Sequence, residues 1–267
     1  MKAHQRIIRE QKAIAPMLEL FPPPANPVLA DAVIKQISYT TAERVILEYE
    51  WLRCMPAIVM YCYGIYFDDV LGGVVVYSQE YSENLGVWDK YGYTGKMLLL
   101  SRGACVHWTP TGTASKLIRK SMELLPPQYK VITATVDELA GEIGTIYQAC
   151  GFHYVGVMRE TKTRLGIRVN GKLIGTRAMR ARFGTEKLDI LKQAYPNMKI
   201  ETQVSKARYF CFRGSVKEKK QHYKAIAHLI KQYPKRAEYV SRAIRANSIS
   251  EGVVQFRDSA LQDANNA

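Results

Sequence analysis

The residues best suited to hold an anion are Gly112, Thr113 and Ala114, which follow a strongly apolar segment and begin a segment with helical periodicity. Small residues at such a point let backbone N–H groups approach a phosphate, and the helix dipole favours the negative charge. An ordinary loop with a helix cap explains the same pattern. The three residues are therefore a candidate cofactor-binding loop.

Two side chains farther along the chain can transfer protons. Tyr147 lies in a short helical segment that ends before Gly151-Phe152, and a phenol with a pKa near ~10 can donate a proton to a leaving group. Asp137 follows an apolar segment, where a carboxylate can orient or deprotonate an attacking amine. The alternatives are a core aromatic for Tyr147 and a helix cap or loop turn for Asp137.

Arg102 interrupts the apolar run 96–106. A buried guanidinium needs an anionic partner, which a phosphate or carboxylate of a ligand or a structural Asp can supply, and the neighbouring Ser101 can hydrogen-bond the same ligand. His107 is either a base or a surface residue. Cys105 and His107 share one face of a strand, but no clear third ligand follows them, so we expect no metal site.

Hydrophobic periodicity predicts the elements that position these residues. The expected order is strand, helix, three strands, helix, strand, helix and strand, preceded by an amphipathic helix. Hairpin-linked strands beside strands joined by crossover helices predict an α+β fold with one mixed sheet and helices on both faces. Thr40 and Glu43 predict a capping box at the start of the second helix. The strands are expected at 32–37, 57–67, 70–78, 96–106, 129–136 and 152–158, and the helices at 1–20, 40–51, 114–125 and 143–150.

The net charge of +14 is concentrated in one part of the chain. Residues 1–158 hold 14 basic and 15 acidic side chains, whereas residues 159–245 hold 23 basic and 6 acidic ones. A uniform solubility surface would not leave the first 158 residues neutral, so we expect a polyanion partner, most simply a nucleic acid. The candidate nucleic-acid-binding side chains are Arg177, Arg180, Arg182, Lys217, Lys220 and Lys224.

The basic segment has its own predicted elements. An Asn-Gly turn at 170–171 predicts a hairpin over 167–174, and helices are expected at 176–183, 185–195 and 217–233, with strands over 198–214. The expected organisation is an N-terminal helix with a Pro-rich linker (1–30), a mixed-sheet domain (31–160), a small basic α/β C-terminal region (161–245) and a flexible tail (246–267).

Composition limits the class of protein. Apolar residues make up 47% of the chain and charged residues 23%, which is typical of a globular protein rather than a disordered one. No apolar run approaches the ~18 residues that cross a bilayer, and the first residues lack the apolar core of a secretory signal. Five cysteines without a C-x-x-C pair favour reduced thiols in the cytoplasm. The oligomeric state stays open.

The order of these features resembles the GNAT acyltransferase superfamily over about residues 33–158. In that superfamily a strand is followed by a Q/R-x-x-G-x-G/A loop that holds the pyrophosphate of an acyl-CoA. A later helix carries a tyrosine four residues before a Gly-Phe pair, and Tyr147 with Gly151-Phe152 matches that spacing. Residues 112–114 match the second half of the loop, whereas 107–111 hold no Gln or Arg.

A narrower resemblance is to the Mom-like proteins of phages, a divergent GNAT branch that modifies adenine in phage DNA and so blocks host restriction. It rests on residues 100–108, Asp137, the Gly-Thr-Ile-Tyr-Gln-Ala series at 144–149, and two later segments, Val-Asn-Gly-Lys (169–172) and Arg-Tyr (208–209). The resemblance implies a GNAT-like fold and a location in the cytoplasm of the host cell. It also implies transfer of a small acyl-derived group to the exocyclic amine of adenine, from acyl-CoA or another acyl donor.

The same resemblance implies roles for the candidate residues. Asp137 would act on the amine, Tyr147 on the leaving group, and Arg102 with the 112–114 loop on anionic groups of the donor. Some Mom proteins carry His-Tyr after the first helix, where this chain has Glu48-Tyr49. Glu48 and Glu50 are either helix-end charges or groups that reach the site.

Two other functions fit the sequence. One is an ordinary acyl-CoA-dependent N-acetyltransferase that acts on a small amine or a protein, which would not need the basic segment. The other is a catalytically inactive DNA-binding accessory protein on a GNAT scaffold, for which the incomplete loop at 107–114 is the main argument.

Overall fold

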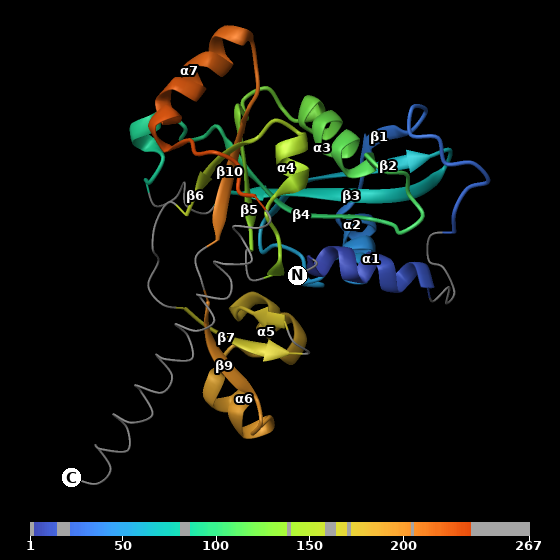
Figure 1. Cartoon of the computed structure of the whole chain (residues 1–267), viewed down its shortest axis with the longest axis vertical. Coiled ribbons are helices and arrows are strands. Elements are labelled where there is room, and N and C mark those ends of the chain that lie inside the picture. The colour runs from blue at the N-terminus through green and yellow to red at the C-terminus, as the bar shows by residue number, and fades with distance from the viewer. Residues whose placement is uncertain are drawn as a thin grey trace.

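The large sheet contains seven strands in the order β1-β2-β3-β4-β5-β10-β6, and a second sheet contains three in the order β8-β7-β9 (Figure 1). The computed structural model describes residues 3–14, 22–80, 86–137, 140–157, 164–169, 172–203 and 206–235. Only β4 and β5 pair in parallel among neighbours of the large sheet. The predicted GNAT-like mixed sheet is thus confirmed. Its strands are β1 (Val33–Gln36), β2 (Val59–Phe67), β3 (Val70–Gln79), β4 (Met97–Cys105), β5 (Val131–Val136), β6 (His153–Gly156) and β10 (Ala207–Phe212).

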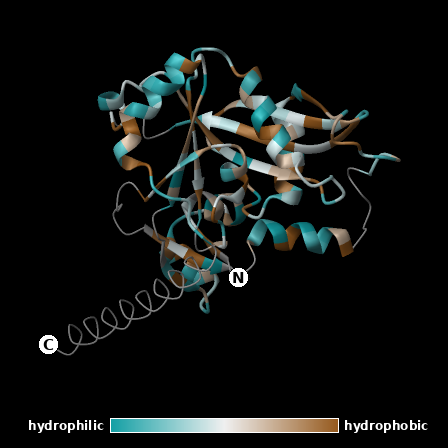
Figure 2. Ribbon diagram, turned by 45° about the horizontal axis from the view of Figure 1, so that its top comes forward, coloured by the Kyte–Doolittle hydropathy of each residue, from teal (hydrophilic) through white to brown (hydrophobic). Residues whose placement is uncertain are grey.

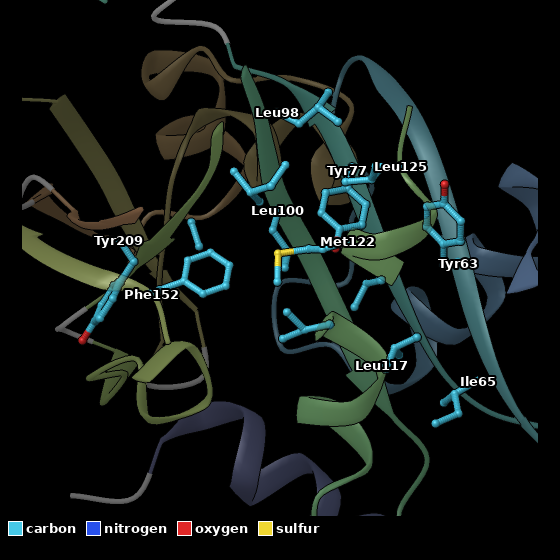
Figure 3. Packing of buried hydrophobic residues seen from close by; sticks show 14 of the residues in the cluster. Tyr63, Ile65, Tyr77, Leu98, Leu100, Leu117, Met122, Leu125, Phe152 and Tyr209 are labelled. Atoms are coloured by element: carbon cyan, nitrogen blue, oxygen red, sulfur yellow. The ribbon is translucent and has the colours of Figure 1, made fainter. Parts of the chain in front are cut away.

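Helices cover both faces of the large sheet. α3 (Thr113–Leu124) and α4 (Thr145–Ala149) lie on one face, where Tyr77 and Leu98 belong to the same buried cluster as Leu117 of α3. α2 (Tyr39–Tyr49) packs on the opposite face against alternate residues such as Val76 and Ala104. Since successive strand residues point to opposite faces, central strands buried on both sides read as continuous apolar runs. Figure 3 shows the α3 side, where Phe152 and Tyr209 lie at one end of the cluster and Tyr63 at the other.

The large sheet is not confined to residues 31–160. β10 lies between β5 and β6 and pairs antiparallel with both, for example Tyr209 with Ala134 and with Tyr154. Tyr209 and Phe210 are fully buried. The boundary expected at residue 160 is therefore corrected: part of the basic segment completes the core, and only the part between β6 and β10 stands as an insertion.

The insertion holds the small sheet and two helices, with the elements β7 (Arg164–Val169), β8 (Lys172–Ile174), α5 (Thr176–Phe183), α6 (Leu188–Ala194) and β9 (Lys199–Gln203). The predicted hairpin is confirmed by the antiparallel pairing of β7 with β8, while its turn at 170–171 lies outside the described residues. Ile174 and Met179 pack with Leu52 and Cys54 in one apolar cluster. The insertion is therefore anchored to the segment that follows α2.

Three helix ends differ from their predictions. The cap of α2 is Ser38, whose hydroxyl accepts from the Thr41 N–H, so the capping box expected at Thr40 is wrong. α6 begins at Leu188 rather than directly after Thr185. α7 (Val216–Ile226) ends earlier than residue 233 and continues as a short 3-10 turn over Ala227–Leu229.

The N-terminal helix α1 (His4–Ile14) packs against the main body instead of standing apart. Figure 2 shows alternating hydrophilic and apolar residues along this helix, beside the N label, and its buried Ile8 contacts the cluster that contains Trp51 and Ala140. The tail expected at 246–267 lies outside the described residues.

Candidate active site

A cavity of about 250 Å³ opens where β4 and β5 separate. Their parallel pairing ends at Leu100 with Ala134. β4 bulges at the next residue, because Val76 pairs with Arg102 and Tyr77 with Leu100, which leaves Ser101 unpaired with β3. A bulge bends its strand and disrupts the local ladder. The cavity is lined by the start of α1, the turn after α2, residues 101–103, the end of β5, the segment leading into α4, and residue 206.

The cavity brings together some of the predicted residues. Tyr147, Ser101 and Arg102 line it, whereas Asp137 and residues 112–114 are not part of its lining. Among the described residues, the carboxylates that line it are Glu50 and Glu142. The sequence predicts Glu50 to be either a helix-end charge or a group that reaches the site, whereas Glu142 is not among the predicted residues.

Tyr147 reaches the cavity from α4. Its ring lies 5.4 Å from the ring of Phe152 and 5.6 Å from that of Tyr209. Burial, followed by the charges of Glu142 and Glu50, raises the pKa of Tyr147 far above its usual value. The phenol is therefore protonated at neutral pH and available as a proton donor.

The residues around Tyr147 explain the Gly-Thr-Ile-Tyr-Gln-Ala series. Gly144 caps α4 with a φ of 72°, and Gln148 donates to the Tyr209 hydroxyl at 3.0 Å. That hydroxyl donates in turn to the Ile143 carbonyl at 2.6 Å. The series thus fixes α4 on β10, and Tyr147 is held by both.

Arg102 is a bridge between β4 and the segment after α2. Its Nε donates to the Cys54 carbonyl at 2.7 Å and its Nη1 to the Ser101 carbonyl at 2.6 Å. The Ser101 hydroxyl is itself bonded to the Val76 carbonyl at 3.1 Å. Arg102 therefore positions the segment that carries Glu50 and supplies positive charge to the cavity wall.

Glu142 is held through both carboxylate oxygens. Oε1 accepts from the Trp51 indole Nε1 at 3.0 Å, and Oε2 accepts from the Asp137 N–H at 3.1 Å. Burial raises the pKa of Glu142 to about 7; the Asp137 N–H and the charge of Lys206 oppose this rise, and the charges of Asp137 and Glu50 add to it.

Glu50 is buried, with 6% of its surface exposed. Its Oε2 accepts from the backbone N–H groups of Leu52 at 2.7 Å and Arg53 at 3.0 Å. Burial raises the pKa of Glu50, although the charge of Arg102 and these two hydrogen bonds act against it. The turn after α2 thus presents a fixed carboxylate beside Arg102.

Asp137 and Lys206 lie at the edge of the cavity. The Asp137 carboxylate is 3.6 Å from Lys206 Nζ, and its backbone N–H holds Glu142. Glu48 lies elsewhere, since it pairs with Lys12 of α1. The His107 ring stacks on that of Tyr49, at 6.3 Å between ring centres.

α1 closes one side of the cavity. Gln5 lines it and is fixed at both ends of its amide, because Nε2 donates to the Tyr49 carbonyl and Oε1 accepts from the Trp51 N–H. One turn later Arg9 donates to the carbonyls of His107 and Thr109. The helix therefore ties the end of α2 to the loop after β4.

The loop at 112–114 fits a pyrophosphate only in part. The backbone N–H and the hydroxyl of Thr113 both donate to the Pro110 carbonyl, so neither is directed at an external anion. Gly112 has a φ of 92°, and a Cβ there would lie 3.2 Å from Leu29. The N–H groups of Ala114 and Ser115 are in the first turn of α3, where a helix offers them no acceptor.

In the described parts of the chain, no group of three His, Cys, Asp or Glu side chains could hold a metal ion. No described helix has both the length and the apolar character needed to cross a bilayer.

The predicted DNA-binding side chains that the structure describes fall on two separate surfaces, while the side chain of Arg177 lies outside the described part of the chain. α5 carries Arg180 and Arg182 on the insertion, and α7 carries exposed Lys217, Lys220 and Lys224. Figure 1 shows α7 at the top of the molecule and α5 below the large sheet, beside β7. Because the insertion packs on Leu52 and Cys54, α5 belongs to the end of the molecule that holds the cavity.

Two cavity residues have weak sequence signals. Glu142 lies between Gly141 and Gly144 directly before the Tyr147 helix. A carboxylate between glycines at that point is a weak indication of a functional side chain. Lys206 precedes a buried strand, and its charge is one among many in the basic segment.

Comparison with known proteins identifies the family. The model of the Mom protein family matches residues 31–235, and no curated protein matches the chain. Similar solved structures include an IAA acetyltransferase from Bacillus cereus (13% identity, 68% of this chain and 100% of that one, TM-score 0.37). Others are a GNAT family acetyltransferase from Elizabethkingia anophelis with acetyl-CoA bound (10%, 68% and 99%, 0.35) and a polyamine N-acetyltransferase from Drosophila melanogaster (9%, 68% and 100%, 0.36). The family match covers the whole large sheet, the cavity residues of β4, β5 and α4, and the insertion; the chain belongs to the Mom protein family.

Proposed function

We propose that the protein is a DNA-modifying transferase of the Mom type, which adds a small acyl-derived group to the exocyclic amine of adenine and protects phage DNA from host restriction. The observation that carries the proposal is the cavity at the β4–β5 separation, where Tyr147 and Arg102 meet two carboxylates. The cavity lies on the same side of the molecule as the basic insertion, because Leu52 lines the cavity and also packs in the apolar cluster of the insertion.

The adenine amine sets demanding conditions for the chemistry. Its lone pair is conjugated with the ring, so it is a poor nucleophile, and inside a duplex it is out of reach unless the base is extruded. A cavity of about 250 Å³ is smaller than the ~300–1,000 Å³ typical of drug-sized pockets. It therefore suits one small group, such as a base edge with its amine.

The residues of the cavity supply complementary groups for this reaction. Carboxylates accept the amine hydrogens and orient the nitrogen, and Tyr147, protonated at neutral pH, can donate to the leaving group. Arg102 and Lys206 offset negative charge on the same wall. We assign Asp137 to the edge of the site, where its N–H positions Glu142 and its carboxylate faces Lys206.

Double-stranded DNA is the proposed partner of the insertion. Arg180 and Arg182 lie on α5, and α5 packs through Met179 and Ala178 into the cluster that contains Cys54. Duplex DNA bound along α5 would thus run past the segment that carries Glu50. Charge-assisted contacts to phosphates hold a duplex in register without reading its sequence.

The donor is proposed as acyl-CoA or another acyl donor. When bound, such a donor supplies an activated carbonyl carbon with a leaving group. The N–H groups of Ala114 and Ser115 are the loop donors suited to its anionic part, while Thr113 bonds to Pro110.

Nucleoside analysis tests the proposal. DNA from cells expressing the chain is digested to nucleosides, and mass spectrometry is used to detect a modified adenosine. We expect it with the native chain and not with Tyr147→Phe, which keeps the ring contacts with Phe152 and Tyr209. The matched control is Tyr195→Phe, at an exposed tyrosine of the insertion, which should modify DNA normally.

The other functions give different results in the same cells. An N-acetyltransferase of small amines or proteins leaves all nucleosides unmodified and changes those substrates instead. A binding accessory protein leaves the nucleosides unmodified while the purified chain still binds DNA. Either result would replace the proposed function.

A further inference from the structure

Glu142 is the cavity carboxylate with the most defined orientation. Its two oxygens accept from donors on different elements, the Trp51 indole after α2 and the Asp137 N–H at the end of β5. Each carboxylate oxygen has a second lone pair, so both remain able to accept from a substrate in the cavity. The group is thus oriented before a substrate arrives, as a proton acceptor in a preorganised site must be.

The groups that face Glu142 come from every element around the cavity. Asp137 directly after β5 and Glu50 after α2 add negative charge, and Lys206 before β10 adds positive charge. The charges of Glu142 and Glu50 raise the pKa of Tyr147 of α4. The charge of Arg102 of β4 acts to lower the pKa of both Tyr147 and Glu50. Burial makes the largest contribution and raises the pKa of Glu142 to about 7, which is the range in which a general base is most efficient at neutral pH.

The two other carboxylates are less suited to accept a proton. Glu50 receives two backbone N–H groups on one oxygen and faces the charge of Arg102, which stabilises its ionised form. Asp137 does not line the cavity, and its carboxylate faces Lys206. Of the described carboxylates, Glu142 is therefore the one that lines the cavity and is held by uncharged donors on separate oxygens, the Trp51 indole and the Asp137 N–H.

We propose that Glu142 is the general base that takes the proton from the attacking amine, an inference that rests on the proposed function. In the step, the amine nitrogen forms a bond to the donor carbon that carries the leaving group, and the bond from that carbon to the leaving group breaks. The amine proton passes to the Glu142 carboxylate. The leaving group keeps the electron pair and takes the Tyr147 proton, and solvent exchange then restores both side chains.

The first test replaces the base. Glu142→Gln keeps the shape of the side chain and one acceptor oxygen, but removes the group that binds the proton. We expect the yield of modified adenosine in cells to fall by about 10²–10⁴-fold, the usual contribution of a general base. Glu123→Gln, at an exposed carboxylate of α3 that pairs with Lys120, is the matched control and should modify DNA as the native chain does.

The second test separates a base from a structural acceptor. Trp51→Phe removes one hydrogen bond to the carboxylate and leaves Glu142 in place, so the charged form is less stabilised and the pKa of Glu142 rises. Purified protein, plasmid DNA and lysate of non-expressing cells as the source of the donor are combined between about pH 5.5 and 9. We expect the acid limb of the native rate near pH 7 and that of Trp51→Phe at higher pH, with activity retained on the alkaline side.

Each outcome has a defined meaning. Full activity of Glu142→Gln overturns the inference, as does an acid limb that stays at the same pH in Trp51→Phe, which would leave Glu142 a structural acceptor. If circular dichroism shows Glu142→Gln unfolded, the pH profile of Trp51→Phe decides alone. A native chain that modifies no adenine refutes the proposed function and the inference with it, whereas an active native chain with an active Glu142→Gln refutes the inference only.

Discussion

Gly144 lies against the ring of Tyr209 so closely that a Cβ on this glycine would be 2.5 Å from Tyr209 Cε2. The two residues are joined by a second contact, because the Tyr209 hydroxyl donates to the carbonyl of the preceding Ile143. The first residue belongs to the motif that carries Tyr147, and the second to the strand inserted between β5 and β6. The position of the proposed proton donor therefore depends on a strand that follows it by some 60 residues.

Replacing Gly144 by Ala should destabilise the fold by about 2–4 kcal/mol, since it combines a strained φ with a clash against a buried ring. Gly151→Ala is the matched control. It has nearly the same φ, 76° against 72°, and no heavy atom within 4 Å of the added Cβ, so it should cost only the backbone strain of about 1 kcal/mol. Denaturant unfolding of both variants measures the difference. Equal losses would show that Tyr209 yields without cost.

Local patterns predict most elements of this chain. The helix expected at 176–183 is α5 with the same bounds, and the Asn-Gly turn correctly predicts the β7–β8 hairpin, because periodicity and turn chemistry act over a few residues. The place of β10 between β5 and β6 depends on pairing with distant strands. A count of charges along the chain averages that buried strand with its basic neighbours, which is why the boundary at 160 was wrong.

The candidate site shows the same division. Ser101, Arg102 and Tyr147, which belong to motifs on single elements, line the cavity. Glu142 acquires its orientation from Trp51, 91 residues earlier in the chain, and no local pattern contains that contact. Asp137 is one of the motif residues, but its place after the end of β5 directs its backbone N–H at Glu142.

A chain ending at residue 160 should not fold into an independent domain. It lacks β10, so β5 and β6 lose the strand between them, and the partners of Tyr209 and Phe210 in two apolar clusters are exposed. A chain ending at residue 235, the end of the family match, is the control. We expect a cooperative thermal transition by circular dichroism for the longer chain only. A cooperative transition in the shorter chain would show that β10 is dispensable for the core.

Modification of DNA should depend more on the phosphate contacts of α5 than on those of α7. Arg180→Ala with Arg182→Ala should make the log–log slope of affinity against salt shallower by up to ~1.8, at ~0.9 per phosphate contact, and should reduce modification. The matched control replaces Lys217 and Lys220 of α7 with Ala; α7 lies above the large sheet in Figure 1, whereas α5 lies below it. If that pair alone reduced modification, the duplex would have to approach the cavity from the α7 side.

The stability of Glu142→Gln relative to the native chain should rise with pH. The pKa of Glu142 is about 7 in the folded protein and has an ordinary value of 4.5, so the folded state binds the proton more tightly than the unfolded state. The stability that this preference contributes is complete below about pH 4.5 and is lost as the pH rises through about 7. Gln cannot ionise, so the variant does not incur the cost of burying a charge.

The difference in unfolding free energy, variant minus native, should therefore increase by up to about 3 kcal/mol between pH 4.5 and 8, at 1.36 kcal/mol for each unit of pKa difference. Guanidinium unfolding at several pH values measures it, and groups that titrate in both proteins largely cancel. Glu123→Gln, on the exposed side of α3, should show a much smaller dependence. A pH-independent difference for Glu142→Gln would mean that solvent or a rearranged Lys206 neutralises the carboxylate in the folded protein, and the cavity would then lack a base poised near neutral pH.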